Sequence, residues 1–188
     1  MRLGFFQLSR LRWLVATILA GSLGFATPAL AADKVVKGWR IMDSLADTDC
    51  TMVSNFEDGT TIMIIWSPRS EITIFAVFND SWDSLRERAD QNLTFKLTFR
   101  GNVEYDEWTD SEAGIVKTDE GSEGIVGTWG REHQLDLAVT IMAAQGVKIE
   151  ADNRVIGNFN LSGTREAILA LRRCGGRIMK KGGDPFAN

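Results

Sequence analysis

Apolar and polar residues alternate over short stretches, separated by turn residues, through most of the chain. Between residues 93 and 99 every odd position is apolar and every even position is polar. Successive side chains of a strand point to opposite faces, so this pattern predicts a strand with one face in the core. Residues 60–66 are apolar almost throughout, which predicts a central strand buried on both faces.

Similar apolar runs bounded by turn residues predict about eight main strands in an antiparallel sandwich or a barrel-like sheet. These are expected at residues 35–42, 49–55, 60–66, 71–78, 93–99, 125–129, 147–151 and 155–161, with shorter segments at 103–108 and 115–116. Asp58-Gly59 is a typical hairpin turn. Residues 49–78 are therefore expected to form three consecutive antiparallel strands in a mainly β fold.

Two short helices are expected beside the sheet. Apolar residues at helical spacing predict a helix at residues 131–145. A second helix follows Ser162 or Thr164, either of which can accept a hydrogen bond from a first-turn N–H. Its apolar face includes Cys174, and Gly175 is expected to end it. The polar stretch at 79–88 predicts a capped helical turn laid over the sheet.

The first 31 residues have the features of a secretory signal peptide. Three arginines without an acidic residue precede a mostly apolar stretch at 13–25, and Ala29-Leu30-Ala31 resembles a cleavage site. The apolar stretch is shorter than the roughly 20 residues of a membrane span, and an uncleaved N-terminal anchor is the alternative. We expect removal of residues 1–31, a single β-rich domain at 32–176, a flexible tail at 177–188, and no membrane span after cleavage. The location would be periplasmic or secreted, in a bacterium.

The net charge of the chain indicates which classes of partner it can bind. The chain has 21 Lys and Arg against 25 Asp and Glu, and loss of the three signal arginines would leave 18 against 25, a net charge of −7. An acidic domain is a poor match for nucleic acid, whose phosphates require a basic face, and for anionic membranes. It is compatible with a cationic envelope protein as partner.

Cys50 and Cys174 are the two cysteines of the chain, 124 residues apart. An oxidising compartment favours a disulfide between them. A redox-active pair usually has only two residues between its cysteines. We therefore predict one structural disulfide that ties the C-terminal helix to the sheet.

No sequence signature supports catalysis or a cofactor. His133 is the only histidine, which excludes a multi-histidine metal site, and the nearest serine, Ser122, lies in a polar loop without a nucleophile elbow. Glycine motifs that hold phosphates are absent. We therefore predict no catalytic residue, no metal site and no cofactor, with His133 as a surface residue at a helix start.

Two groups of acidic residues leave alternatives open. Asp43, Asp47 and Asp49 form one group, and residues 104–112 contain the other. Carboxylates at short spacing can bind Ca²⁺, but the spacing lacks the EF-hand pattern. A pair of carboxylates across a cleft could also hydrolyse a glycoside. The third interpretation is solvated loop charge.

Two tryptophans, Trp82 and Trp108, stand in acidic surroundings, and Asp106 and Glu107 directly precede Trp108. An exposed tryptophan ringed by carboxylates is a candidate hot spot for a basic partner. Packing on the sheet is the alternative. These four residues are the partner-binding candidates of the sequence.

Several structural motifs occur together in the chain: Gly38-Trp39, Cys50 one strand later, an Asn-x-x-Trp turn at 79–82, and a terminal helix from Leu161 to Cys174. With these motifs the chain resembles small exported proteobacterial proteins of unknown function. The resemblance covers nearly all of residues 38–174. The chain departs from the shared pattern in the last motif, where Ser162 and Gly163 are followed by Thr164-Arg165-Glu166-Ala167. It supports the cysteine pairing and implies no activity.

The sequence therefore favours a non-catalytic periplasmic or secreted binding or envelope-associated module. An inhibitor of a basic secreted enzyme, such as a lysozyme or protease, is the first alternative. A small carboxylate- or metal-dependent hydrolase is the second.

Overall fold

The computed structural model describes residues 34–43, 48–82, 85, 93–118 and 121–183 of the 188-residue chain. The described part contains ten strands and two helices. In chain order they are β1 (Lys34–Val36), β2 (Trp39–Asp43), β3 (Cys50–Asn55), β4 (Thr60–Ser67), β5 (Ile72–Asn79), β6 (Leu93–Gly101), β7 (Glu107–Lys117), β8 (Glu123–Trp129), α1 (Arg131–Ala143), β9 (Ala144–Ala151), β10 (Arg154–Asn160) and α2 (Thr164–Gly183).

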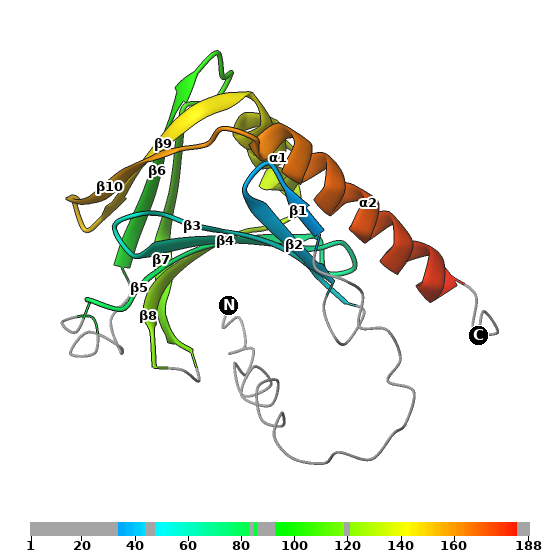
Figure 1. The fold of residues 1–188 in the computed structure, drawn as a ribbon, viewed down its shortest axis with the longest axis horizontal. Coiled ribbons are helices and arrows are strands. Elements are labelled where there is room, and N and C mark those ends of the chain that lie inside the picture. Colours follow the sequence, from blue (N-terminus) through cyan, green and yellow to red (C-terminus); the bar gives the residue numbers. More distant parts are fainter. Residues whose placement is uncertain (1–33, 44–47, 83–84, 86–92, 119–120, 184–188) are drawn as a thin grey trace, which may run out of the picture. The chain divides into compact units, whose positions relative to one another are not determined.

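The strands form one antiparallel sheet in the order β1-β2-β3-β4-β5-β8-β7-β6-β9-β10. The first half of β7 pairs with β6 and its second half with β8, so β7 joins two parts of the sheet. Although β10 is last in this order, Phe159 on β10 meets Phe56 in the β3–β4 turn, with ring centroids 4.9 Å apart. The sheet therefore curls back on itself, as Figure 1 shows, and the predicted mainly β, barrel-like fold is confirmed.

The core lies inside this curl. Phe95 on β6 packs against Phe75 on β5 and Trp129 on β8, with ring centroids 6.3 and 6.4 Å apart. All three side chains are less than 5% exposed. Burial of such large apolar side chains is the main stabilising contribution in a domain of this size, and here it joins strands far apart in the sheet order.

Both helices lie on the core side of the sheet. α2 packs against α1 and against the strands β1 to β4. Cys174 on α2 forms a disulfide with Cys50 on β3, with their Cα atoms 6.0 Å apart. The predicted disulfide is thus confirmed. The single hydroxyl proton of Thr164, at the start of α2, is shared between the carbonyls of Ile141 and Leu161, instead of the side chain capping a backbone N–H.

The predicted helix stop at Gly175 is wrong. α2 continues to Gly183, so residues 177–183 are helical although the sequence assigned them to a tail. Gly175 is buried against the β4–β5 turn, where an added Cβ would lie 3.7 Å from Pro68, and Ile178 is only 3% exposed. Packing of Gly175 and Ile178 against the domain outweighs the low helix propensity of glycine.

Two strand predictions are also corrected. The run at 35–42 is a hairpin of β1 and β2, because Lys37 and Gly38 adopt positive φ and turn the chain. The two segments expected at 103–108 and 115–116 are replaced by a single eleven-residue strand, β7. Asp110 supports this strand, since its carboxylate accepts hydrogen bonds from the N–H groups of Glu112 and Thr128, at 2.9 and 2.8 Å.

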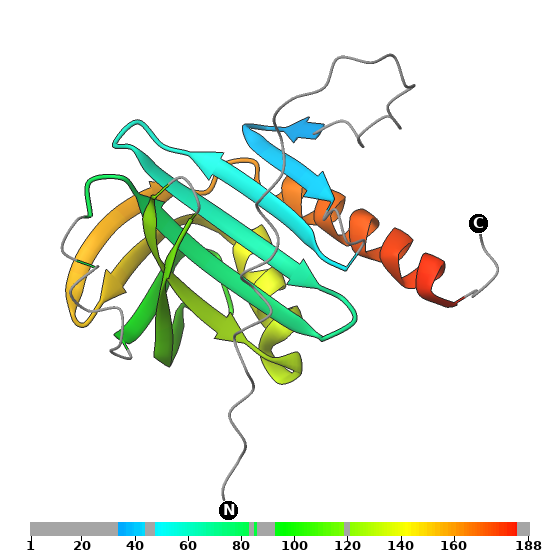
Figure 2. The ribbon, with the colours of Figure 1, turned by 90° about the horizontal axis from the view of Figure 1, so that it is seen from below.

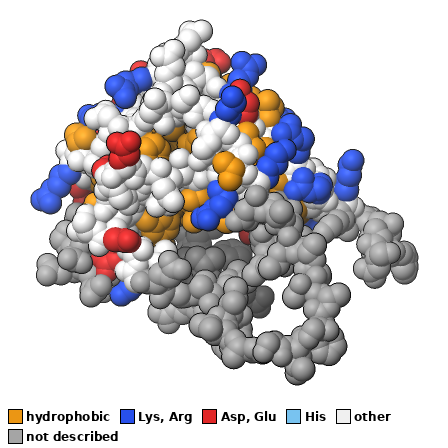
Figure 3. All heavy atoms as spheres, viewed as in Figure 1, with side chains coloured by type: hydrophobic (Ala, Val, Ile, Leu, Met, Phe, Trp, Pro, Cys, Tyr) orange, Lys and Arg blue, Asp and Glu red, His pale blue; other side chains and the backbone are white. Residues whose placement is uncertain are grey.

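The helices of the described part include none with the length and apolar character needed to span a membrane. Basic side chains gather along α2 (Figure 3), whose exposed positions include Arg165, Arg172, Arg173, Arg177 and Lys180. The chain has a net negative charge, but its charged side chains are unevenly distributed over the surface, because basic ones gather on α2.

Candidate functional site

A cavity of about 470 Å³ lies where the start of β7 meets the end of β8 and the start of α1. It is lined by aromatic and acidic side chains together with one threonine and the histidine. These residues are Tyr105, Glu107, Trp108, Thr109, Trp129, Glu132, His133 and Asp136. We call this the acidic aromatic cavity.

The floor of the cavity is rigid because its two tryptophans belong to the core. Trp108 pairs in register with Leu97, which is fully buried, so its indole lies on the core side of β7. Trp108 is 8% exposed and Trp129 is 4% exposed. The rings of Tyr105 and His133 meet that of Trp108 edge-on, with centroids 6.2 and 5.8 Å away. Tyr105, 49% exposed, is the aromatic residue that a partner can reach most easily.

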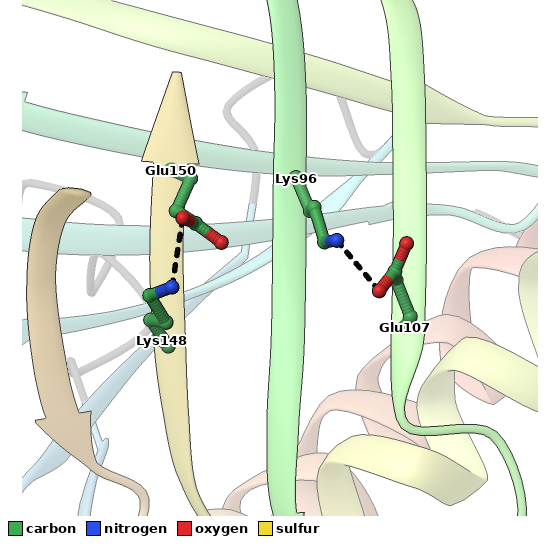
Figure 4. Close-up of polar contacts among 4 residues, drawn as sticks. All are labelled: Lys96, Glu107, Lys148 and Glu150. Atoms are coloured by element: carbon green, nitrogen blue, oxygen red, sulfur yellow. Dashed lines mark hydrogen bonds and ion pairs between the residues drawn. The ribbon is translucent and has the colours of Figure 1, made fainter. Parts of the chain in front are cut away.

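The rim of the cavity carries three carboxylates, which differ in whether they form an ion pair with a described residue. Glu107 forms an ion pair with Lys96 on β6, with 2.6 Å between the charged atoms (Figure 4). This hydrogen bond raises the pKa of the Lys96 ammonium; the negative charges of Glu107, Glu150 and Asp106 add to it, and desolvation opposes it. Glu132 and Asp136 form no ion pair with any described residue.

Glu132 and Asp136 share one side of α1 because they are four residues apart, about one helical turn. Glu132 is in the first turn, where the helix dipole favours a negative charge. The helix thus presents two carboxylates beside the aromatic rings. The site is suited to holding a positive charge.

The structure separates the four partner-binding candidates of the sequence. Trp108 and Glu107 line the cavity, and Asp106 is exposed on the loop before β7, where its carbonyl accepts a hydrogen bond from Phe99. Trp108 is only 8% exposed, so it packs in the sheet, the alternative that the sequence left open, and a role of Trp108 in partner binding stays a prediction.

Trp82 does not belong to this site. It follows the end of β5, beside the first residue of β8, whereas the cavity adjoins Trp129 at the last residue of β8. The seven residues of β8 span up to about 20 Å at roughly 3.4 Å per residue. Trp82 is partly buried against the core. The two tryptophans therefore do not line the same cavity.

The sequence did not identify six of the cavity residues as site residues: Tyr105, Thr109, Trp129, Glu132, His133 and Asp136. They come from a loop, two strands and a helix, and no motif connects them. His133 was expected only as a surface residue at a helix start. The sequence held one indication that His133 lies near Trp129. His133 closely follows the apolar strand that ends at Trp129, so the first turn of α1 begins beside Trp129.

The structure also bears on the catalytic and metal alternatives. Ser122 adjoins the first residue of β8 and donates a hydrogen bond to Asp80, so it lies far from His133. Within the described ranges, no three His, Cys, Asp or Glu side chains converge as a metal site would need. Asp47 lies outside the described residues.

Comparison of the chain with models of known protein families, with curated proteins and with solved structures gives no match, so the functional argument rests on the acidic aromatic cavity.

Proposed function

We propose that the protein is a non-catalytic binding module, periplasmic or secreted, that receives an arginine or lysine side chain of a partner protein in the acidic aromatic cavity. The observation that carries the proposal is the position of Glu132 and Asp136, without ion pairs among the described residues, beside the rings of Tyr105 and Trp108. Aromatic rings attract a cation held over them, and carboxylates add a direct charge interaction.

The surroundings of the cavity favour a protein over a small molecule as partner. Leu135 and Val139 on α1 are 58% and 50% exposed. They are one helical turn apart, so they form an apolar strip next to Asp136. Large exposed apolar side chains beside a pocket that takes one anchor residue are typical of protein interfaces.

Inhibition of a basic secreted enzyme is the narrower form of this proposal. In that case the anchor would be a basic residue at the rim of the enzyme's active site. Opposite charges would speed association and make the complex sensitive to salt. A stoichiometric loss of lysozyme or protease activity, reversed by salt, would distinguish an inhibitor from a general binding module.

The proposal predicts that an arginine-rich peptide quenches or shifts the tryptophan fluorescence of the protein at low salt. Tyr105→Ala and Asp136→Asn should each weaken binding by about 2- to 30-fold, the range that corresponds to roughly 0.5–2 kcal/mol for a cation–π or exposed charge contact. Neither side chain is in the core, since Tyr105 is 49% exposed and Asp136 is exposed. The fold should therefore be preserved in both variants.

Glu57→Gln is the matched control, because Glu57 is an exposed carboxylate in the β3–β4 turn, away from the cavity. It removes the same unit of charge and should leave the affinity nearly unchanged. Equal weakening by Glu57→Gln and Asp136→Asn would mean that only the net charge matters. That result, or an absence of binding at low salt, would contradict the proposed site.

A further inference from the structure

One side of α2 is exposed from residue 165 to residue 180, and this side is basic. Its exposed positions recur every three to four residues, so they form one continuous stripe along the helix. Five of them are basic: Arg165, Arg172, Arg173, Arg177 and Lys180. Glu166 is the one acidic residue of the stripe. We call the exposed stripe between residues 165 and 180 the basic face.

The charges of the basic face are not neutralised in the way that charges on the sheet are. On β6 and β9, Lys96 and Lys148 each form an ion pair with a carboxylate, at 2.6 and 2.7 Å (Figure 4). On the basic face, no ion pair with a described residue is formed by Arg165, Arg172, Arg173 or Lys180. Positive charges without such partners attract an anionic surface.

Two further cations extend the basic face at the ends of α2. Lys37, exposed in the β1–β2 turn, lies against Gly163, just before the helix. Arg69, exposed in the β4–β5 turn, donates a hydrogen bond to the carbonyl of Ile178 at 3.4 Å. Figure 2 shows α2 along the edge of the domain, with no described strand on its outer side. The result is an elongated basic surface more than about 22 Å long, at 1.5 Å per helical residue.

The composition of the basic face favours a lipid surface as its partner. Residues 165–183 contain no Ser, Thr, Asn or Gln, so the face offers charged and apolar side chains only. Leu169 and Met179 stand among the cations and are 38% and 54% exposed. On a nucleic acid these two side chains would meet charged phosphates. At a lipid surface they can enter the interface, while the long basic side chains keep their charges at the phosphates.

We propose that the basic face docks α2 lengthwise on a membrane surface that contains anionic phospholipids. The lipid phosphates bind the cations, and Leu169 and Met179 enter the headgroup region. Each basic residue near such a surface contributes roughly fivefold to the affinity, so the four without ion pairs contribute about 600-fold.

The net negative charge of the chain does not prevent this docking. In physiological salt, exposed charges more than about 8 Å apart are largely screened, so the local charge of the basic face decides. The acidic aromatic cavity lies at the first turns of α1, whereas α1 meets the start of α2 through Ile141, near its other end. No residue of the basic face lines that cavity. The inference is therefore independent of the proposed function.

Co-sedimentation with lipid vesicles tests the docking, using protein whose N-terminus, established by mass spectrometry, lies after the apolar stretch at 13–25. We expect binding at low salt to vesicles of phosphatidylglycerol and phosphatidylcholine in equal parts. Salt of about 1 M should release the protein, because the screening length falls to about 3 Å. Absence of binding, or equal binding to vesicles of phosphatidylcholine alone, overturns the proposal.

A double variant, Arg172→Gln with Arg173→Gln, tests the position of the docking surface. It should weaken binding to the anionic vesicles about 25-fold, at fivefold for each charge. Lys117→Gln with Arg154→Gln is the matched control, because both residues are exposed, on β7 and β10, outside the basic face. Circular dichroism checks that both variants are folded. Equal weakening in the two variants would mean that only the net charge matters and would overturn the proposed surface.

A last comparison separates a lipid surface from other anionic partners. Met179→Gln should weaken binding to the anionic vesicles about 3- to 10-fold, because an apolar side chain no longer enters the interface. It should leave the weaker binding of polyglutamate unchanged. Polyglutamate that binds as tightly as the vesicles would assign the basic face to an acidic protein. Displacement from the vesicles by millimolar inorganic phosphate would assign it to the free anion, and either result overturns the lipid proposal.

Discussion

Replacing Cys50 and Cys174 by serine is expected to lower the free energy of unfolding by about 5 kcal/mol, the chain-entropy value for a loop this long. The disulfide closes a loop of 124 residues. It joins α2 to β3, so it removes from the unfolded chain most of the conformations in which the C-terminal helix is separated from the sheet. For a domain of this size the melting temperature should fall by roughly 10–20 °C.

Urea unfolding followed by circular dichroism measures this change. The parent protein with reductant should match the double serine variant, and reductant should not alter that variant further. A loss below about 1 kcal/mol would contradict the expectation and would mean that contacts of α2, such as those of Ile168 and Leu171, hold the helix without the bond.

Phe95→Ala is expected to lower the free energy of unfolding by about 3–5 kcal/mol, the usual cost of removing a buried aromatic ring. Phe95 is fully buried between Phe75 and Trp129. It also lies over Gly127, where an added Cβ would be 2.6 Å from its ring. The ring thus fills the space where β6 faces β5 and β8, and no neighbouring backbone can easily close the resulting cavity.

Thr94→Ala is the control for Phe95→Ala, because Thr94 is the adjacent residue with its side chain exposed. Denaturant unfolding should show little change for the control. Since Trp129 contacts Phe95 and also lines the acidic aromatic cavity, Phe95→Ala should weaken peptide binding as well. A Phe95→Ala variant as stable as Thr94→Ala would show that the two parts of the sheet are held by other contacts.

The strand predictions succeeded where burial alternates along the chain. At residues 93–99 the odd positions are buried in β6, as the alternation predicted. The polar stretch after residue 104 carries no such alternation, so the sequence indicated only short segments at 103–108 and 115–116 and not the single strand β7. That strand depends on partners on both sides, β6 and β8, which are distant in sequence.

The outward face of β4 was only partly predicted by the sequence. The run at 60–66 predicted a strand buried on both faces, yet only one face of β4 is covered by described elements. For the acidic aromatic cavity, the sequence identified Trp108 and Glu107 but joined them to Trp82. Linear patterns show that a residue is aromatic in an acidic context, and they do not show which end of a strand it occupies.

The sequence by itself determined the mainly β antiparallel class, because the alternation of apolar and polar residues is a local pattern. It also determined the pairing of Cys50 with Cys174, because two cysteines allow only one pairing within the chain. Only the tertiary structure decided how far α2 extends, how β7 joins the sheet, and which side chains meet at the acidic aromatic cavity. These features depend on contacts between segments far apart in the chain, where packing outweighs local preference.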